Sequence, residues 1–210
     1  MIVSSNLPPL RMTDPVQQYR ETLARWITKS EFCDISIGYV SRESLIELDR
    51  LAREFNTKIR LTLGMYFSEG MPEPLFHQLR QLSEEWEKDE VGEIRLVLPF
   101  KYHGKTFVFY KDGQPAAAVC GSGNLSVLKP VADTLRSYEV GVLVEEGTDL
   151  QILSEFAQRI ASSQISKKIS DVESIRIVKE RNRALDDFEL AAPIPPNNVK
   201  YFKKQQSEFE

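Results

Sequence analysis

The 210-residue sequence lacks the features that would place it in a membrane or outside the cell. No apolar run approaches the roughly 20 residues that a membrane-spanning helix needs, and the N-terminus lacks a signal-peptide pattern. The two cysteines, Cys33 and Cys120, are too few and too far apart for a disulfide framework or a metal site. Each lies in an apolar run, where we expect a buried thiol. These absences favour a cytoplasmic protein that has no membrane partner.

The chain is also poor in positive charge, with a formal net charge of -4. This balance argues against a broad surface for nucleic acid, but the acidic residues are concentrated between positions 69 and 93. The segment around His103 is locally basic, with Lys101, Lys105 and Lys111 close by in the sequence. Because net charge governs solubility and non-specific binding, an acidic total does not exclude a small phosphate-binding pocket.

Hydrophobic spacing predicts that strands and helices alternate. We expect a helix from Asp14 to Thr28, with Asp14 as its N-cap and Pro15 at its first position, and a second helix capped by Ser41. Strands and helices that alternate in this way indicate an α/β fold with a mixed, mainly parallel sheet sandwiched by helices. The remaining expected helices cover 72–86 and 149–161, and the expected strands cover 32–40, 58–63, 94–98, 106–110, 116–120 and 141–144.

Composition divides the chain into three parts. Residues 1–165 are expected to form the α/β domain, and 166–190 a helical extension with a charged amphipathic helix at 170–185. Residues 191–210 have the composition of a linker or tail. Such a linker can lead to a further domain, and the residues leave open whether the natural chain continues past Glu210.

The chemistry-bearing residues lie on either side of a predicted β-hairpin. The chain has only two histidines; His77 falls on the expected outer side of a helix, whereas His103 begins an extended run. Strand alternation places Lys105 on the same side as His103. The turn at 112–113 is Asp-Gly, a strong hairpin signal, and the returning strand ends in a Gly-Ser-Gly-Asn turn that closes on Asn124.

This set of residues fits the attack of a nucleophile on a phosphodiester. A neutral imidazole such as that of His103 can form a covalent phosphohistidine, while Lys105 and Asn124 donate to the non-bridging oxygens. A carboxylate such as Glu139 can fix the tautomer of the imidazole through its second ring nitrogen. The residues include no carboxylate cluster and no His/Cys spacing suited to a metal, so no metal or other cofactor is expected.

The order His-x-Lys followed by Gly-Ser-x-Asn resembles the signature of the phospholipase D superfamily. Leu63-Gly64-Met65-Tyr66, Pro99-Phe100 and Gly-Ser-Gly-Asn-Leu-Ser narrow the likeness to the catalytic domain of NgoFVII/BfiI-like restriction endonucleases, over about 14–161. The family signature has an aspartate five residues after its lysine, where this chain has Tyr110. We therefore take Glu139 as the candidate for the missing carboxylate.

The resemblance implies a metal-independent restriction endonuclease that cuts double-stranded DNA. His103, Lys105, Asn124 and Glu139 are its expected catalytic residues; Ser122, Gly123, Lys101 and Tyr66 are expected to bind substrate. Phospholipase D sites use two His-x-Lys sets and this chain has one, so a homodimer should share one site. The resemblance also implies a separate DNA-recognition domain, and leaves open an ATP-dependent helicase subunit.

Simpler interpretations remain for several of these residues. Glu139 could be an exposed residue at the start of a strand, and Ser122 could bind phosphate, bind Glu139 or serve only the turn. Tyr66 and Lys101 could face solvent. At the level of function, the alternatives are a phospholipase D-like hydrolase of another phosphodiester and a non-catalytic DNA-binding or scaffold subunit.

Overall fold

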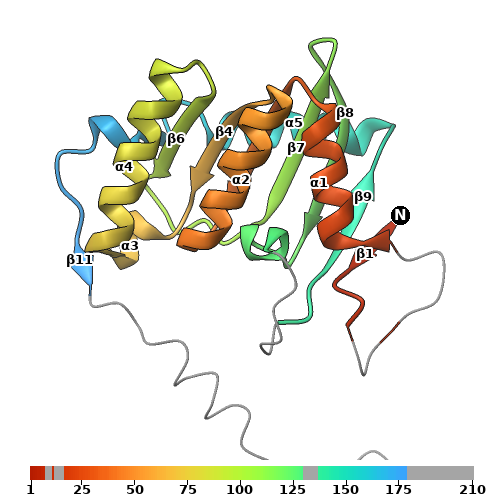
Figure 1. Ribbon diagram of the computed structural model, residues 1–210, viewed down its shortest axis with the longest axis horizontal. Helices are drawn as coiled ribbons and strands as arrows, with labels where there is room; N and C mark the ends of the chain where they lie inside the picture. The colour runs from red at the N-terminus through yellow and green to blue at the C-terminus, as the bar shows by residue number, and fades with distance from the viewer. Residues whose placement is uncertain (8–10, 12–16, 130–136, 179–210) are drawn as a thin grey trace, which may run out of the picture. The chain divides into compact units, whose positions relative to one another are not determined.

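The computed structural model describes residues 1–7, 11, 17–129 and 137–178, which form a sheet with helices on both of its faces (Figure 1). The main sheet has nine strands. Across the sheet their order is β10 (Ser166–Lys168), β6 (Gly92–Val97), β4 (Lys58–Leu63), β3 (Phe32–Ile37), β7 (Thr106–Lys111), β8 (Gln114–Gly121), β9 (Val140–Val144), β1 (Ile2–Ser4) and β2 (Gln17–Gln18). A second, two-stranded sheet pairs β5 (Met71–Pro72) with β11 (Ile177–Val178).

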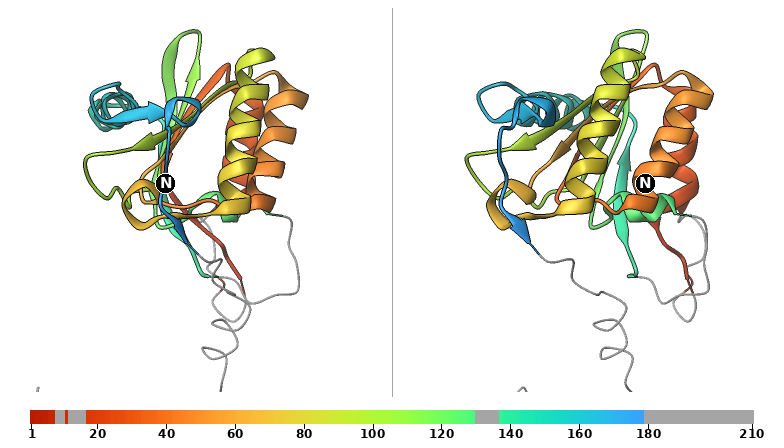
Figure 2. Two further views of the ribbon diagram at one scale, coloured as in Figure 1. Left: turned by 90° about the vertical axis from the view of Figure 1, so that its left-hand side faces the viewer. Right: turned by 60° about the vertical axis from the view of Figure 1, so that its left-hand side comes forward.

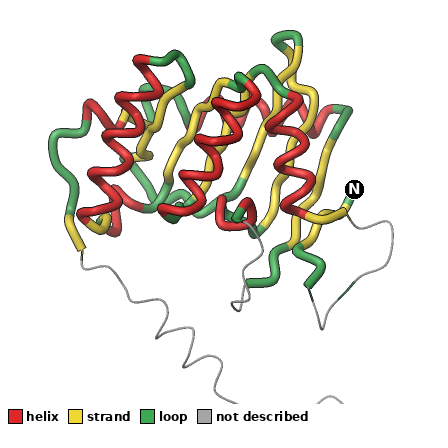
Figure 3. Tube along the Cα trace, viewed as in Figure 1, coloured by secondary structure: helices red, strands yellow, loops and turns green. Residues whose placement is uncertain are grey.

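The helices form two separate layers. The α-helices are α1 (Tyr19–Lys29), α2 (Arg42–Phe55), α3 (Tyr66–Glu69), α4 (Glu73–Lys88) and α5 (Thr148–Ile160), and the short 3-10 helices are η1 (Leu125–Leu128) and η2 (Ile169–Asp171). Helices α1, α2 and α4 lie side by side across one face of the sheet, as Figure 3 shows in red. Helix α5 covers the opposite face (Figure 2). The expected α/β/α sandwich is therefore confirmed.

Strand alternation supplies a core to each layer. Cys33, Ile35 and Ile37 of β3 are completely buried in the larger core, beneath α1, α2 and α4. Val108 and Ala118 point the other way and pack with α5 in a second, smaller core. Strand β3 is buried on both faces although its second face carries the polar residues Asp34 and Ser36, and Asp34 is ion-paired there with Arg60.

The mixed character of the sheet is confirmed, but the sheet is not mainly parallel. Only β6–β4, β4–β3 and β1–β2 are parallel; the other five pairs of the main sheet are antiparallel. A parallel pair needs a crossover connection such as a helix. Helices α2 and α4 supply these crossovers for β3, β4 and β6, whereas the chain then turns to a hairpin and its antiparallel neighbours.

Local signals explain several element boundaries. The Ser41 hydroxyl accepts from the Ser44 backbone N–H, and the Ser44 side chain reaches back to Ser41, which makes the predicted cap a complete capping box. The β7–β8 turn has positive φ at both Asp112 (52°) and Gly113 (71°), as a two-residue hairpin requires. The predicted second helix and the predicted hairpin are both confirmed.

Other boundaries differ from the sequence-based expectations. Helix α1 begins at Tyr19 rather than at Asp14, because residues 17–18 pair with β1 as a strand; Asp14 and Pro15 lie outside the described residues. The expected helix at 170–185 is wrong for its described part. There the chain forms η2 and then β11, which pairs with β5, while residues from 179 onward lie outside the described residues.

The two cysteines have different environments. Cys33 is fully buried in β3, as expected, but Cys120 near the end of β8 is exposed. Cys120 pairs with Thr106 on one side and Val142 on the other, and the exposed Val142 shows that this part of the sheet face is uncovered. Of the helices in the described ranges, none is both long and apolar enough to cross a membrane.

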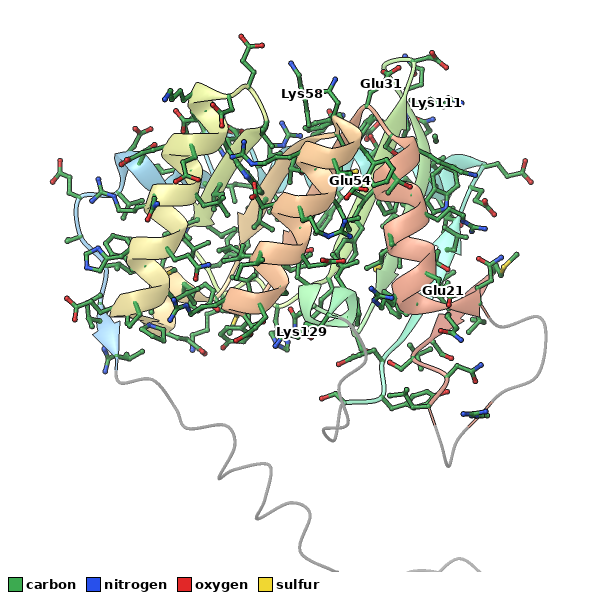
Figure 4. All side chains as sticks on the ribbon, in the orientation of Figure 1. Glu21, Glu31, Glu54, Lys58, Lys111 and Lys129 are labelled. Carbon is green, nitrogen blue, oxygen red and sulfur yellow. The ribbon has the colours of Figure 1, made fainter. Side chains whose placement is uncertain are left out.

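The two ends of the sheet carry different groups. Glu31, which precedes β3, and Lys58, the first residue of β4, lie at one end together with Lys111 of the hairpin tip (Figure 4). Lys129, which follows η1, is at the opposite end. Strands β3 and β4 finish at this second end, so the loops after them meet the segments that carry the predicted catalytic residues.

Candidate active site

The loop from Lys101 to Lys105 crosses the end of the sheet between β6 and β7. It has no regular secondary structure, and the Tyr102 backbone N–H anchors it by donating to the Gly64 carbonyl at 2.9 Å. A Cβ on Gly64 would lie 2.0 Å from the Tyr102 carbonyl oxygen, so only glycine permits this approach. The loop therefore depends on the Gly64 position that follows β4.

His103 and Lys105 lie directly beside each other. The Lys105 Nζ atom is 3.2 Å from each ring nitrogen of His103 and 2.7 Å from the His103 carbonyl oxygen. Lys105 is buried, whereas His103 is exposed. The imidazole is thus accessible to a substrate, and a phosphate bound at the ring would have the ammonium group within reach.

Asn124 reaches the same place from the other side of the hairpin. It follows the Gly-Ser-Gly turn after β8 and precedes η1. Its Oδ1 atom accepts a hydrogen bond from the Tyr39 backbone N–H at 3.3 Å. The turn and the His103 loop are also tied together directly, because the Gly121 backbone N–H donates to the Lys105 carbonyl at 3.1 Å.

Gly38 and Tyr39, directly after β3, connect these two segments. A Cβ on Gly38 would lie 3.0 Å from Cδ2 of His103, so the imidazole rests against the backbone there. The rings of Tyr39 and His103 meet edge to face, with centroids 5.9 Å apart and planes at 72°. Neither residue was predicted from the sequence. Their position at the carboxyl end of a parallel strand could have indicated them, because ligands bind at this place in open α/β sheets.

Glu139 lies with Ser122, just before β9. The Ser122 hydroxyl donates to the Glu139 carboxylate and accepts from the Val140 backbone N–H at 3.1 Å. The Glu139 backbone N–H donates to the Ser5 hydroxyl at 3.0 Å. Among the contacts of the described residues, the Glu139 carboxylate therefore meets Ser122 rather than the imidazole of His103.

Glu139 nevertheless influences the site through its charge. Burial lowers the pKa of Lys105, because desolvation disfavours the ammonium form, and the negative charge of Glu139 opposes this by raising the pKa. The structure thus places Glu139 near the lysine of the pair.

The remaining predicted substrate-binding residues have different roles in the structure. Lys101 is exposed and forms an ion pair with Glu69, at 3.0 Å between Nζ and Oε1. Tyr66 is buried, and its hydroxyl donates to the Val40 carbonyl at 2.8 Å and accepts from the Val40 N–H at 3.0 Å. Gly123 is buried, and a Cβ there would meet Val127 at 2.8 Å. Lys101 therefore faces solvent near the site, while Tyr66 and Gly123 belong to its packing.

In the part of the chain that the structure describes, the second histidine and the carboxylates form no further site. His77 lies on the outer surface of α4 with its side chain 71% exposed and its Nε2 atom 3.7 Å from Glu73. Its predicted exposure is confirmed. Within the described ranges, no group of three or more His, Cys, Asp or Glu side chains is arranged to hold a metal ion.

Comparisons with known proteins identify the family of the chain. Residues 19–174, more than half of the chain, match the model of the NgoFVII restriction endonuclease N-terminal PLD domain. No curated protein sequence matches the chain.

Two solved structures share the fold at low sequence identity. The phosphatidylserine synthase of Haemophilus influenzae Rd KW20 is 14% identical, with a TM-score of 0.55 over 97% of this chain and 44% of that one. This chain therefore spans less than half the length of the synthase. Nuc from Salmonella typhimurium, a phospholipase D family member, is 12% identical, with a TM-score of 0.54 over 80% of this chain and 95% of that one.

Proposed function

The chain belongs to the NgoFVII restriction endonuclease family, whose N-terminal phospholipase D domain it matches, and we propose that it hydrolyses phosphodiester bonds of double-stranded DNA. One observation carries the proposal. The exposed imidazole of His103 and the buried ammonium of Lys105 lie 3.2 Å apart, at the end of the sheet where Asn124 is also held. A scaffold protein would have no use for this combination of a nucleophile and two donors.

The chemistry follows from these three side chains. A ring nitrogen of His103 attacks phosphorus, and the bond from phosphorus to the leaving deoxyribose oxygen breaks with its electron pair on that oxygen. Lys105 and the Asn124 amide donate to the non-bridging oxygens, whose charge is concentrated in the transition state. Water then attacks the phosphohistidine, and the phosphorus–nitrogen bond breaks to restore the imidazole.

This cycle needs a second acid–base group besides His103. The leaving oxygen takes up a proton in the first step, and the attacking water gives one up in the second. His77, the other histidine, is held on the exposed surface of α4 beside Glu73. We therefore propose that the imidazole of a second copy of the chain supplies this group, so that a homodimer forms one shared site around a two-fold axis.

DNA specificity and metal requirement follow from the same groups. Lys105 and Asn124 contact phosphate oxygens, which carry no base-sequence information, so a recognition site would be read by a separate module. The positive charge that a metal ion brings to phosphoryl transfer is assigned here to Lys105. Cleavage is therefore expected to continue in EDTA.

Plasmid DNA and bis(p-nitrophenyl) phosphate, a small chromogenic phosphodiester, together test the proposal. Wild-type protein in EDTA should cleave both, and His103→Ala should abolish both activities, while the matched control His77→Ala should retain them. With bis(p-nitrophenyl) phosphate as substrate, mass spectrometry after quenching at alkaline pH should find a p-nitrophenyl phosphoryl group on the peptide that contains His103, because one p-nitrophenolate leaves and the other ester stays. Sedimentation of the active species should give a dimer.

The alternatives predict different results. Headgroup release from phosphatidylcholine vesicles without DNA cleavage would point to a phospholipid substrate. DNA binding without cleavage of either phosphodiester would favour the scaffold. Full activity of a monomer would rule out the shared site, and activity abolished by EDTA and restored by Mg²⁺ would contradict the metal-independent mechanism.

A further inference from the structure

Tyr39 contacts the candidate site through three different groups, namely its backbone, its ring and its hydroxyl. It follows Gly38 in the segment that connects β3 to α2, at the sheet end where His103 and Asn124 meet. Its side chain is partly buried against the main core. None of the sequence motifs includes it.

The backbone N–H of Tyr39 fixes the orientation of the Asn124 amide. It donates to Oδ1 at 3.3 Å. The two atoms of an amide group point in different directions, so an Oδ1 that faces the Tyr39 backbone turns the Nδ2 donors away from it. Phosphate oxygens need donors, and this contact therefore selects the amide orientation that is useful to an anionic substrate.

The ring of Tyr39 forms a side wall for the imidazole of His103. The two rings meet edge to face at 5.9 Å and 72°. Tyr39 is supported in turn by Tyr66, at 5.4 Å and 87°, whose hydroxyl is held by two hydrogen bonds to the Val40 backbone. The imidazole also lies against the backbone of Gly38. An exposed imidazole on an irregular loop thus has two supporting contacts, the ring of Tyr39 and the backbone of Gly38.

The hydroxyl of Tyr39 ties down the loop that carries His103. It donates to one carboxylate oxygen of Glu69, and the other oxygen of the same carboxylate accepts from Lys101 Nζ at 3.0 Å. Lys101 lies two residues before His103. Glu69 therefore links the end of β3 to the start of the catalytic loop.

We propose that Tyr39 is a positioning residue of this site, which sets the attack direction of His103 through its ring and the donor direction of Asn124 through its backbone. The inference rests on the proposed phosphodiesterase function and adds a residue that the catalytic motifs do not contain. The ring acts on the turnover step because it orients a reacting group, whereas the hydroxyl acts on the loop through Glu69.

Two substitutions separate these contributions. Tyr39→Ala removes the ring, and its kcat on bis(p-nitrophenyl) phosphate should fall by about 10- to 100-fold with little change in KM, since misplacing a reacting group by about 1 Å can cost this much. Tyr39→Phe keeps the ring but loses the hydrogen bond to Glu69, so its kcat should fall by a smaller factor than that of Tyr39→Ala. Phe76→Ala is the matched control, because Phe76 is a partly buried aromatic residue packed on the same core.

A double-mutant cycle tests the link to Asn124. The backbone N–H remains in Tyr39→Ala, but its segment loses the support of the ring. Asn124→Ala should therefore reduce kcat by a smaller factor in the Tyr39→Ala background than in wild type. Equal factors in both backgrounds would show that Tyr39 does not position the amide.

A spectroscopic measurement tests the contact independently of activity. The chain has only two histidines, so the imidazole C–H signals in an NMR spectrum are readily assigned to His103 and His77. Loss of the aromatic ring should shift the His103 signals in Tyr39→Ala and leave those of His77 in place, while Tyr39→Phe, which keeps the ring, should shift the His103 signals less. Unmoved His103 signals together with an unchanged kcat would overturn the inference. An inactive wild type would instead count against the proposed function, and the NMR measurement would still decide the role of Tyr39.

Discussion

Replacing Gly38 with alanine should lower activity without destabilising the fold. The added Cβ would lie 3.0 Å from His103 Cδ2, about 0.4 Å short of the 3.4 Å at which ordinary contact begins. Taking a loss of roughly 100-fold for 1 Å of misplacement, a shift of 0.4 Å gives about a sixfold lower kcat. Gly38 is absent from the glycines with positive φ, so alanine adds no backbone strain and restricts the unfolded chain, which stabilises by roughly 0.4–1 kcal/mol.

The assay compares kcat on bis(p-nitrophenyl) phosphate with the free energy of unfolding in urea for each variant. Gly147→Ala is the opposite control: its φ is +85° and nothing lies within 4 Å of the added Cβ. It should lose about 1–2 kcal/mol of stability from left-handed strain and keep its kcat. Gly38→Val, with two more methyl groups, should have a lower kcat than Gly38→Ala. Wild-type kcat in both Gly38 variants would refute the idea that the imidazole must rest against this backbone.

Three further predictions concern charge and capping. In Glu139→Gln the pKa of Lys105 should fall further, because the lost carboxylate no longer opposes the effect of burial. The alkaline limb of the kcat–pH profile should therefore move to lower pH. An unmoved limb would mean that Glu139 does not act on Lys105. Asp34→Ala should lower the free energy of unfolding in urea by about 3 kcal/mol, because it removes the carboxylate partner of Arg60. The double change Asp34→Leu/Arg60→Met should lower it much less, and equal losses in the two variants would contradict this account. Ser41→Ala removes the capping box of α2 and should cost about 1 kcal/mol by the same measurement, with a cost near zero arguing against the cap.

Local patterns were enough to predict much of the fold. Strand β4 has the predicted bounds, and the capped start of α2 and the Asp-Gly hairpin turn are where the sequence places them. These features depend on neighbouring residues alone. Strand direction across the sheet does not, because it depends on which strand pairs with which. Thus β7 inserts beside β3 as an antiparallel neighbour, and a mainly parallel sheet was the wrong expectation.

The candidate site also has residues that local sequence patterns predict and contacts that they do not. His103, Lys105 and Asn124 were predicted because their spacing around a hairpin is a local signal, and the structure brings them to one end of the sheet. The contacts of Tyr39 and Gly38 with His103 could not be predicted in this way, because they join positions more than 60 residues apart in the sequence. Glu139 was chosen as the partner of the imidazole, and only side-chain geometry could show that its carboxylate meets Ser122.

The hairpin gives the site a further dependence on distant structure. Register pairs Thr106 both with Ser36 of β3 and with Cys120 of β8, and this places Lys105 beside the turn that leads to Asn124. A slip of one residue would turn every side chain of β7 to the opposite face. The Asp-Gly turn and the register shift between Phe109 and Tyr110 set this register together, and the turn lies some six residues away, about 20 Å along the strand. A change at either place can therefore separate the predicted catalytic groups without touching any of them, which makes strand register part of the geometry of the candidate site.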